Sequence, residues 1–303
     1  MKIQDSAVND VRAAHLVSER WLADVGSKDP SVRIIDVRWY LLGKSGREEY
    51  ARGHIPGSVF VALEDISADQ GPGRHPIPSA EKFTAAMRAA GVSATTHVIA
   101  YDDAGGSIAA RLLWLLHRYG HARASVLDGG LPAWTAAGLP LSTEAATPPA
   151  GDFVAKLDPS ISALDKVHVN AARERTRSGD ALILDARAVE RYRGDSEPVD
   201  ARPGHIPGAK SAPWSSNLRE GRFKSSEELK EQYRALGAER AREVIVYCGS
   251  GVTACHDWLA LKLAGVGGVH LYEGSWSDWA RDPALPAATG MDDGANANSG
   301  GGT

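Results

Sequence analysis

The part of the sequence best suited to covalent chemistry is the segment 247–253, YCGSGVT. Its cysteine, Cys248, follows an apolar run typical of a buried strand, and a helical pattern begins a few residues later. The N–H groups of a tight glycine-rich turn and the positive end of the helix dipole would then point at the Cys248 sulfur. Because that setting favours a negative charge, we expect the sulfur to act as a nucleophilic thiolate.

The neighbouring loop residues support this prediction. Gly249 and Gly251 allow the backbone to curl tightly, whereas larger side chains would fill the bowl around the sulfur. Val252 and Thr253 complete the expected substrate-binding loop and lead into the helix. A buried structural cysteine followed by an ordinary turn is the alternative, because free cysteine is commonly a small core residue.

A phosphatase with a loop cysteine is a second alternative. That chemistry requires a longer loop ending in an arginine that holds the phosphoryl oxygens through two N–H groups. Here Thr253 is followed by Ala254 and Cys255. Since the arginine is missing, the sequence disfavours a phosphatase.

Two arginines are candidates for binding an anionic substrate. Arg187 and Arg191 follow a second apolar run, which ends at Asp185. Guanidinium groups that enter a site from one strand end can hold a carboxylate or a sulfonate. Ordinary surface arginines would give the same local sequence.

The elements that position these residues occur twice. Four landmarks recur in the same order and at nearly constant spacing: RIIDVR and LILDAR, the two GHIPG segments at 53–57 and 204–208, HVIAY and EVIVY, and LDGGLPAW and YEGSWSDW. A single shared pentapeptide could arise by chance, but four ordered matches indicate two duplicated domains.

Each copy has the pattern of an α/β domain. Short apolar runs rich in branched residues predict buried parallel strands, and each of two such strands is followed by a small-residue loop and a helix. The loops would gather at the carboxyl ends of the strands, where open α/β sheets bind ligands. The predicted strands are 34–36, 98–101, 182–185 and 244–247, and the predicted helices are 108–119 and 252–264.

The two copies differ at the position of the nucleophile. When Tyr101 is aligned with Tyr247, Asp102 of the first copy occupies the place of Cys248. The first loop keeps small residues but has no nucleophile. We therefore predict one competent site and one catalytically silent copy.

Several motifs of the chain are distinctive: the paired GHIPG segments, RHPIP at 74–78, LDGGLPAW, CGSGVTAC at 248–255 and YEGSW. Together they resemble a tandem rhodanese-domain sulfurtransferase, most closely the 3-mercaptopyruvate type. The resemblance implies two rhodanese-like domains, each a mainly parallel sheet flanked by helices. It covers an N-terminal domain at 10–142, a linker at 143–159 and a C-terminal domain at 160–286, and residues 287–303 are predicted to be a disordered tail. It also implies a persulfide intermediate, with no metal and no organic cofactor.

Several site residues follow from this resemblance. In the family, arginines matching Arg187 and Arg191 bind the anionic donor. In the 3-mercaptopyruvate type, Ser250 is joined by a histidine and an aspartate of the first domain. His75 matches the histidine, whereas the acidic position falls on Glu64, with one methylene more than aspartate.

The loop composition bears on the choice of donor. Thiosulfate-type relatives place basic side chains directly after the cysteine, whereas Gly249 and Ser250 are uncharged. We therefore favour 3-mercaptopyruvate over thiosulfate, with cyanide, a small thiol or a thioredoxin-like protein as the sulfur acceptor. A persulfide carrier without turnover is an alternative of another class.

Other conspicuous residues have structural interpretations. His54 and His205 occupy both GHIPG segments, so turn structure is favoured over catalysis. Cys255 is expected to be a core residue of the helix. Trp39 either lines the substrate site or packs in the core, and Arg202 is a further candidate anion contact.

Composition limits the remaining functions. Lys and Arg total 34 against 38 Asp and Glu, for a net charge of −4, which offers no basic face for nucleic acid or anionic lipid. The N-terminal residues have no signal-peptide pattern, and no run is long enough to cross a membrane. With two cysteines and no disulfide framework, we expect a cytoplasmic location.

Overall fold

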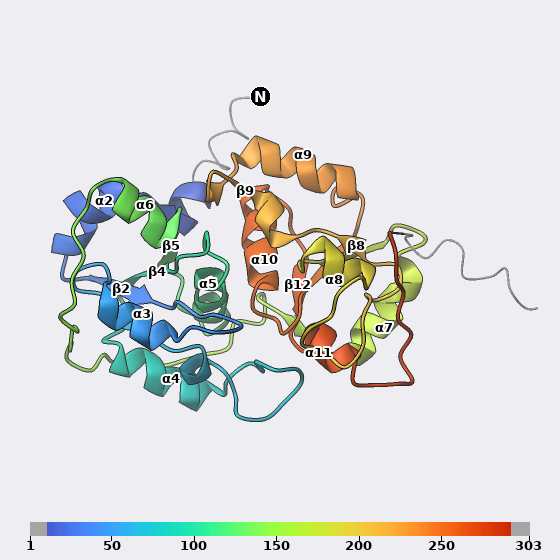
Figure 1. Cartoon of the computed structure of the whole chain (residues 1–303), viewed down its shortest axis with the longest axis horizontal. Helices are drawn as coiled ribbons and strands as arrows, with labels where there is room; N and C mark the ends of the chain where they lie inside the picture. Colours follow the sequence, from blue (N-terminus) through green and yellow to red (C-terminus); the bar gives the residue numbers. More distant parts are fainter. Residues whose placement is uncertain (1–10, 292–303) are drawn as a thin grey trace, which may run out of the picture.

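Each half of the chain forms a five-stranded sheet in which neighbouring strands are parallel, as predicted. The strand orders are β1-β5-β4-β2-β3 and β6-β12-β11-β7-β8, so the two sheets share one topology. The computed structural model describes residues 11–291, and Figure 1 shows the two sheets side by side with helices around each. Residues 292–303 of the tail predicted at 287–303, and residue 10 of the predicted first domain, lie outside the described part.

The strands are short, and the four predicted from sequence are confirmed with bounds extended by at most two residues. The first sheet contains β1 (Leu16–Val17), β2 (Val32–Asp36), β3 (Val59–Phe60), β4 (His97–Tyr101) and β5 (Ala124–Leu127). The second contains β6 (Ala163–Leu164), β7 (Ala181–Asp185), β8 (Lys210–Ser211), β11 (Glu243–Tyr247) and β12 (Val269–Tyr272), and a separate antiparallel hairpin is made by β9 (Leu218–Arg219) and β10 (Arg222–Phe223).

Helices cover both faces of each sheet. The first domain contains α2 (Glu19–Asp24), α3 (Gly46–Arg52), α4 (Ala80–Ala89), α5 (Ala109–Arg118) and α6 (Gly130–Ala136), with the 3₁₀ helices η1 (Gly26–Lys28) and η2 (Glu64–Ile66). The second contains α7 (Lys166–Arg175), α8 (Val189–Arg193), α9 (Ser226–Leu236), α10 (Ala254–Leu263) and α11 (Ser275–Trp279), with η3 (Trp214–Asn217).

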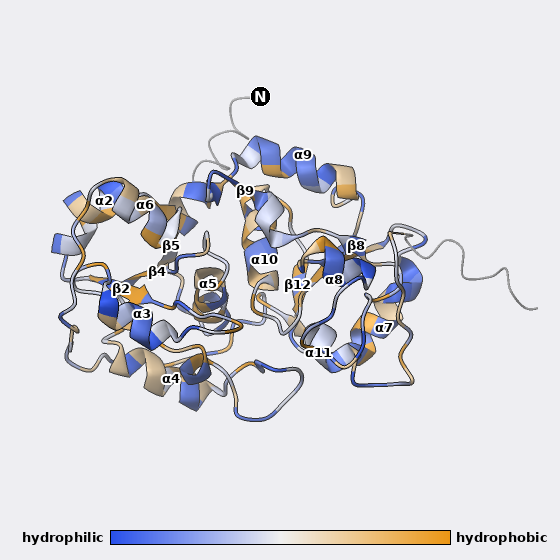
Figure 2. Cartoon of the chain, in the orientation of Figure 1, coloured by the Kyte–Doolittle hydropathy of each residue, from blue (hydrophilic) through white to orange (hydrophobic). Residues whose placement is uncertain are grey.

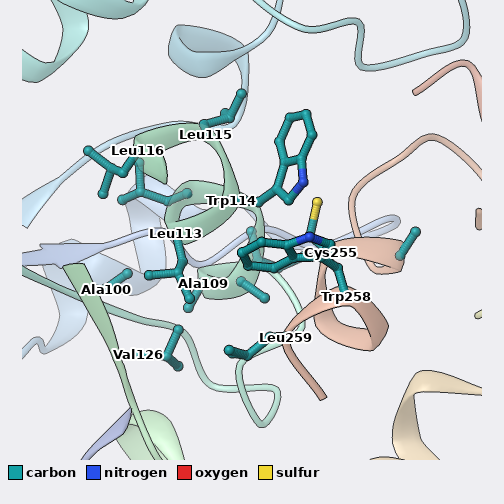
Figure 3. Packing of buried hydrophobic residues seen from close by; sticks show 14 of the residues in the cluster. Ala100, Ala109, Leu113, Trp114, Leu115, Leu116, Val126, Cys255, Trp258 and Leu259 are labelled. Atoms are coloured by element: carbon teal, nitrogen blue, oxygen red, sulfur yellow. The ribbon is translucent and has the colours of Figure 1, made fainter. Parts of the chain in front are cut away.

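The two domains share one core. Leu22 of α2 and Trp134 of α6 pack on one face of the first sheet, and α4 and α5 pack on the other. In the second domain, α7 and α11 cover one face while α9 and α10 cover the other. Helices α5 and α10 meet between the domains, where Trp114 lies close to Cys255 and Trp258 (Figure 3). This buried contact fixes the orientation of one domain against the other.

Hydropathy follows these layers. In Figure 2 the apolar colours concentrate on the central strands, while α9 is mostly hydrophilic on its outer side. Its inward residues, Leu229 and Tyr233, are fully buried. None of the helices within residues 11–291 combines the length and the apolar character needed to cross a membrane.

The connecting segments are more closely packed than expected. In the segment predicted as the linker, Phe153 is buried and its N–H group donates to the Val92 carbonyl at 3.2 Å. At the other end, Ala288 and His205 exchange backbone hydrogen bonds of 2.9 and 2.8 Å. Beyond the predicted end of the second domain at 286, the chain continues to hydrogen-bond with that domain up to Gly290.

The register brings the site-bearing strand ends together. Asp185, the last residue of β7, lies opposite Tyr247, the last residue of β11. The arginine-bearing segment and the cysteine loop therefore leave the sheet side by side, at the carboxyl edge.

Candidate active site

The Cys248 loop is held from outside by the start of α11. The N–H group of Cys248 donates to Ser275 Oγ at 3.1 Å, and its carbonyl accepts from the Trp276 N–H group at 2.9 Å. The Gly249 carbonyl accepts from the N–H group of Ser277, also at 2.9 Å. These contacts fix the turn without using the N–H groups on its inner side. Cys248 is 2% exposed.

The inner N–H groups of the loop are free. Within residues 11–291, the N–H groups of residues 249–254 donate to no protein acceptor. Gly251 adopts a positive φ of 76°, and a Cβ there would lie 2.6 Å from the Glu273 carbonyl oxygen. Glycine is thus required for this turn. The arrangement is suited to an anion at the centre of the loop.

The first domain contains the same kind of loop, with the carboxyl group of Asp102 inside it. One oxygen of the Asp102 carboxylate accepts from Ala104 and Gly106 and the other from Ile108 and Ala109, at 2.8–2.9 Å. Asp102 is completely buried, and this burial raises its pKa while the four N–H groups oppose that rise. The predicted alignment of Asp102 with Cys248 therefore places an acceptor of backbone N–H groups where the other domain has sulfur.

The first domain reaches into the Cys248 site. His75 Nδ1 lies 2.8 Å from Ser250 Oγ, and the Trp39 ring meets the His75 ring edge to face at 5.2 Å. Burial, followed by Arg111 and Arg74, lowers the pKa of His75 to about 4, so the imidazole is neutral near pH 7. The sequence-predicted pair of Ser250 and His75 is thus brought together across the domain boundary.

Arg111 supports this boundary from α5. Its completely buried guanidinium donates to the Gly251 carbonyl and to the His75 carbonyl, both at 3.1 Å. One side chain of the first domain therefore positions both the cysteine loop and the histidine. Of the remaining loop residues, Val252 is buried and Thr253 directly precedes α10.

Arg191 faces the loop. A Cβ at Gly249 would lie 3.4 Å from Arg191 Nη1. Arg191 Nη2 donates to Glu197 at 2.7 Å and to Asp200 at 2.8 Å, and its side chain is 17% exposed. It is thus partly accessible and adjacent to the cysteine loop.

The prediction that Arg187 binds the donor needs correction. Its side chain is 1% exposed and donates to both oxygens of Asp185, to Glu197 and to the Gly204 carbonyl. In the first domain Arg38 makes the same contacts with Asp36 and the Gly53 carbonyl. Since the arrangement recurs where there is no cysteine, it stabilises the strand end and the GHIPG turn.

Glu64 and Arg202 also lie elsewhere. Glu64 begins η2 with an exposed side chain, and within the described residues it makes no hydrogen bond to His75 or Ser250. The structure therefore does not bring Glu64 together with that pair, as the resemblance had implied. Arg202 donates to the carbonyls of Asp282 and Leu285 at 2.9 and 2.7 Å, which ties down the segment after α11.

Three structural interpretations are confirmed. His54 stacks on Tyr50 and His205 on Tyr192, each at a ring separation of 3.8 Å, and both imidazoles are fully buried. Cys255 is fully buried beside Trp258, and burial raises the pKa of its thiol to about 12.

Sequence reasoning missed Arg74, Arg111, Glu197 and Asp200. Arg74 directly precedes His75 in RHPIP, and that adjacency was the available signal. Its guanidinium pairs with Asp200, and a Cβ at Gly249 would lie 2.9 Å from Arg74 Nη2.

Comparisons with known proteins agree with this architecture. A model of the rhodanese-like domain matches residues 19–137 and 168–282. The chain is 41% identical over 288 residues to the probable 3-mercaptopyruvate sulfurtransferase of Pseudomonas aeruginosa, covering 92% of this chain and 99% of that one. It is 39% identical over 283 residues to the putative thiosulfate sulfurtransferase SseB of Mycobacterium tuberculosis, covering 92% and 98%.

A solved structure gives the same result. The crystal structure of SseA from Escherichia coli, a 3-mercaptopyruvate sulfotransferase, superposes with a TM-score of 0.77 at 36% identity, covering 86% of this chain and 98% of that one. With both sheets matched and nearly the full length covered, the chain belongs to the two-domain rhodanese family of sulfurtransferase enzymes.

Proposed function

We propose that this enzyme transfers sulfur from 3-mercaptopyruvate through a persulfide on Cys248. The observation that carries the proposal is the 2.8 Å contact between His75 Nδ1 and Ser250 Oγ beside the cysteine loop. This contact places two neutral polar side chains next to a loop that favours an anion. Such a pair can hydrogen-bond with the thiol group of a donor such as 3-mercaptopyruvate while that thiol reacts.

The proposed first half-reaction forms one bond and breaks one. The Cys248 thiolate attacks the thiol sulfur of the donor, and an S–S bond forms as the C–S bond breaks. The electron pair of that C–S bond leaves on the three-carbon fragment, which takes up the thiol proton and departs as pyruvate. The free N–H groups of residues 249–254 stabilise the charge on the persulfide that remains.

Ser250 and His75 are proposed to handle the donor's polar groups. The Nδ1 atom of neutral His75 can accept a hydrogen bond from the Ser250 hydroxyl group. The Ser250 oxygen then remains free to accept a hydrogen bond from the donor thiol. In the second half-reaction the outer sulfur passes to cyanide, a small thiol or a thioredoxin-like protein, and the Cys248 thiolate is regenerated.

The charges near the loop favour a donor with one negative charge. Arg74 and Arg191 share Asp200, and Glu197 also accepts from Arg191, so the two cations nearest to Gly249 are opposed by two carboxylates. A dianion would enter with too little compensating charge, and an uncompensated buried charge is costly.

We therefore expect kcat/KM with cyanide as the acceptor to be at least about tenfold higher for 3-mercaptopyruvate than for thiosulfate, a difference of about 1.4 kcal/mol. The measurement is a comparison of initial rates at matched donor concentrations and constant ionic strength. A higher kcat/KM for thiosulfate would contradict the charge argument and would favour the second candidate, a thiosulfate sulfurtransferase, which is the function given for the Mycobacterium tuberculosis relative.

The low pKa of His75 gives a pH prediction. Because the folded state holds the pKa near 4 instead of 6.5, His75 remains neutral until the pH falls towards 4. Activity should therefore show no His75-dependent loss between pH 8 and about 5.5. Stability should fall as the pH decreases from 6.5 towards 4, because the unfolded chain binds the proton first. An acid limb near pH 6.5 in kcat/KM that disappears in His75→Asn would contradict this assignment.

Two further aspects belong to the same proposal. The first domain is catalytically silent, because Asp102 cannot form a persulfide, yet it contributes His75 and Arg111 to the site. A cytoplasmic location is supported by two free cysteines and the need for a reduced Cys248.

A further inference from the structure

A donor carboxylate is best oriented near Cys248 by two hydrogen-bonding cations, and the strand-end arginines supply only one. Arg191 is partly exposed and borders the loop, whereas the side chain of Arg187 is 1% exposed and occupied by Asp185. A single guanidinium can hold a carboxylate, but two fix its orientation relative to the reacting sulfur.

Arg74 of the first domain lies where the second cation is needed. The segment before α4 extends towards α11 of the other domain (Figure 1), and the Arg74 N–H group donates to Ser277 Oγ at 3.1 Å. Ser277 in turn donates its own N–H group to the Gly249 carbonyl at 2.9 Å. The backbone of Arg74 is thus fixed against the segment that holds the cysteine loop.

Gly249 makes room for both guanidinium groups. A Cβ at this position would lie 2.9 Å from Arg74 Nη2 and 3.4 Å from Arg191 Nη1. The two cations therefore approach the same point of the loop from different domains. Burial is the main cause of the lowered pKa of Arg74, and the nearby charge of Arg191 lowers it further, as expected for two guanidinium groups that lie close together.

A carboxylate of the protein already bridges these two arginines. One oxygen of Asp200 accepts from Arg74, and the other accepts from Arg191 at 2.8 Å. Asp200 belongs to the segment 195–203, which has no equivalent of the same length in the first domain. Its side chain therefore displays the interaction that a donor carboxylate would make.

We propose that Arg74 is a donor-binding residue, and that the donor carboxylate binds between Arg74 and Arg191 in exchange for Asp200. This rests on the proposed function in one respect, that the donor is a small carboxylate. The anion site would then span both domains, and the silent domain would contribute to substrate recognition as well as to the His75 pair.

The test compares alkylation of Cys248 by iodoacetate and by iodoacetamide, which are similar in size and differ in charge. Both reagents transfer a carbon to the thiolate with loss of iodide, so the ratio of their rate constants reports attraction of a carboxylate to the loop. Peptide mapping assigns the product to Cys248, because Cys255 is fully buried with a thiol pKa of about 12.

Arg74→Gln should lower the iodoacetate-to-iodoacetamide ratio at least about tenfold, since hydrogen bonds to charged groups are the strong ones. Arg74→Lys should give an intermediate ratio, because it keeps the charge but loses the paired donors. Asp200→Asn should raise the ratio, since it removes the competing carboxylate. A role of Arg74 in structure alone would not produce changes of opposite sign in these variants.

Arg281→Gln is the matched control, because Arg281 is exposed and acts on Arg74 only through space. A ratio for Arg74→Gln equal to that of the control would overturn the proposal, as would a fall in the ratio for Asp200→Asn. Because no sulfur donor enters this assay, the result is independent of whether 3-mercaptopyruvate or thiosulfate is the better substrate.

Discussion

Replacing Cys248 by serine is expected to abolish sulfur transfer while leaving the fold intact. Sulfur and oxygen differ little in size, so the buried loop accommodates the change. The serine hydroxyl, however, is a much poorer nucleophile than a thiolate and cannot hold a sulfane sulfur. We expect kcat/KM to fall by at least about 10⁴-fold. Intact-mass spectrometry after donor treatment should show one added sulfur on the unmodified enzyme and none on Cys248→Ser.

Cys255→Ser is the matched control for this prediction. Cys255 lies in the core between α5 and α10, and its Sγ donates to the Gly251 carbonyl at 3.4 Å, an interaction that a serine hydroxyl can also make. This variant should keep most of the activity. Retained turnover in Cys248→Ser, or an added sulfur that maps to Cys255, would refute the assignment of the nucleophile.

The strands and helices that carry this site could be predicted from the sequence, because the patterns that specify them lie within short stretches of the chain. Continuous apolar runs predicted β4 and β11, since strands covered by helices on both faces need no polar residues. The duplicated landmarks then aligned Asp102 with Cys248, because each residue directly follows the matching strand runs HVIAY and EVIVY. Helices α5 and α10 begin and end within two residues of the predicted bounds.

The side-chain partners of the site could not be predicted in the same way. Arg187 and Arg191 are four residues apart and look equivalent in sequence. In the structure, however, Arg187 forms an ion pair with Asp185, whereas Arg191 does not. That difference depends on the turn at Gly204, seventeen residues away in the chain. Position relative to a strand end therefore does not by itself identify a substrate-binding arginine.

The contribution of the first domain was harder still to foresee. Arg74, His75 and Arg111 reach the loop only because α5 and α10 pack across the domain boundary. Nothing local in the sequence encodes that packing. Glu64 illustrates the opposite error, since a position that matches a family pattern in alignment can still face solvent when the segment around it forms a 3₁₀ turn.

The Asp102 loop of the first domain offers a test of the physical basis of the Cys248 loop. Replacing Asp102 by asparagine should lower the free energy of unfolding by about 3 kcal/mol, because a buried N–H group left without an acceptor costs about 1–3 kcal/mol. Each Asp102 oxygen accepts two N–H groups, so the asparagine NH₂ group must face two donors whichever way the amide is turned. Urea unfolding followed by tryptophan fluorescence measures the change.

Asp69→Asn is the control, because it makes the same chemical change at an exposed side chain paired only with Lys82. Its effect should stay within about 0.5 kcal/mol. If Asp102→Asn were equally harmless, the N–H groups of the first loop would not require a negatively charged acceptor. The inference that the equivalent N–H groups favour a thiolate and a persulfide at Cys248 would then lose its support, and the reactivity of that cysteine would have to come from the arginines alone.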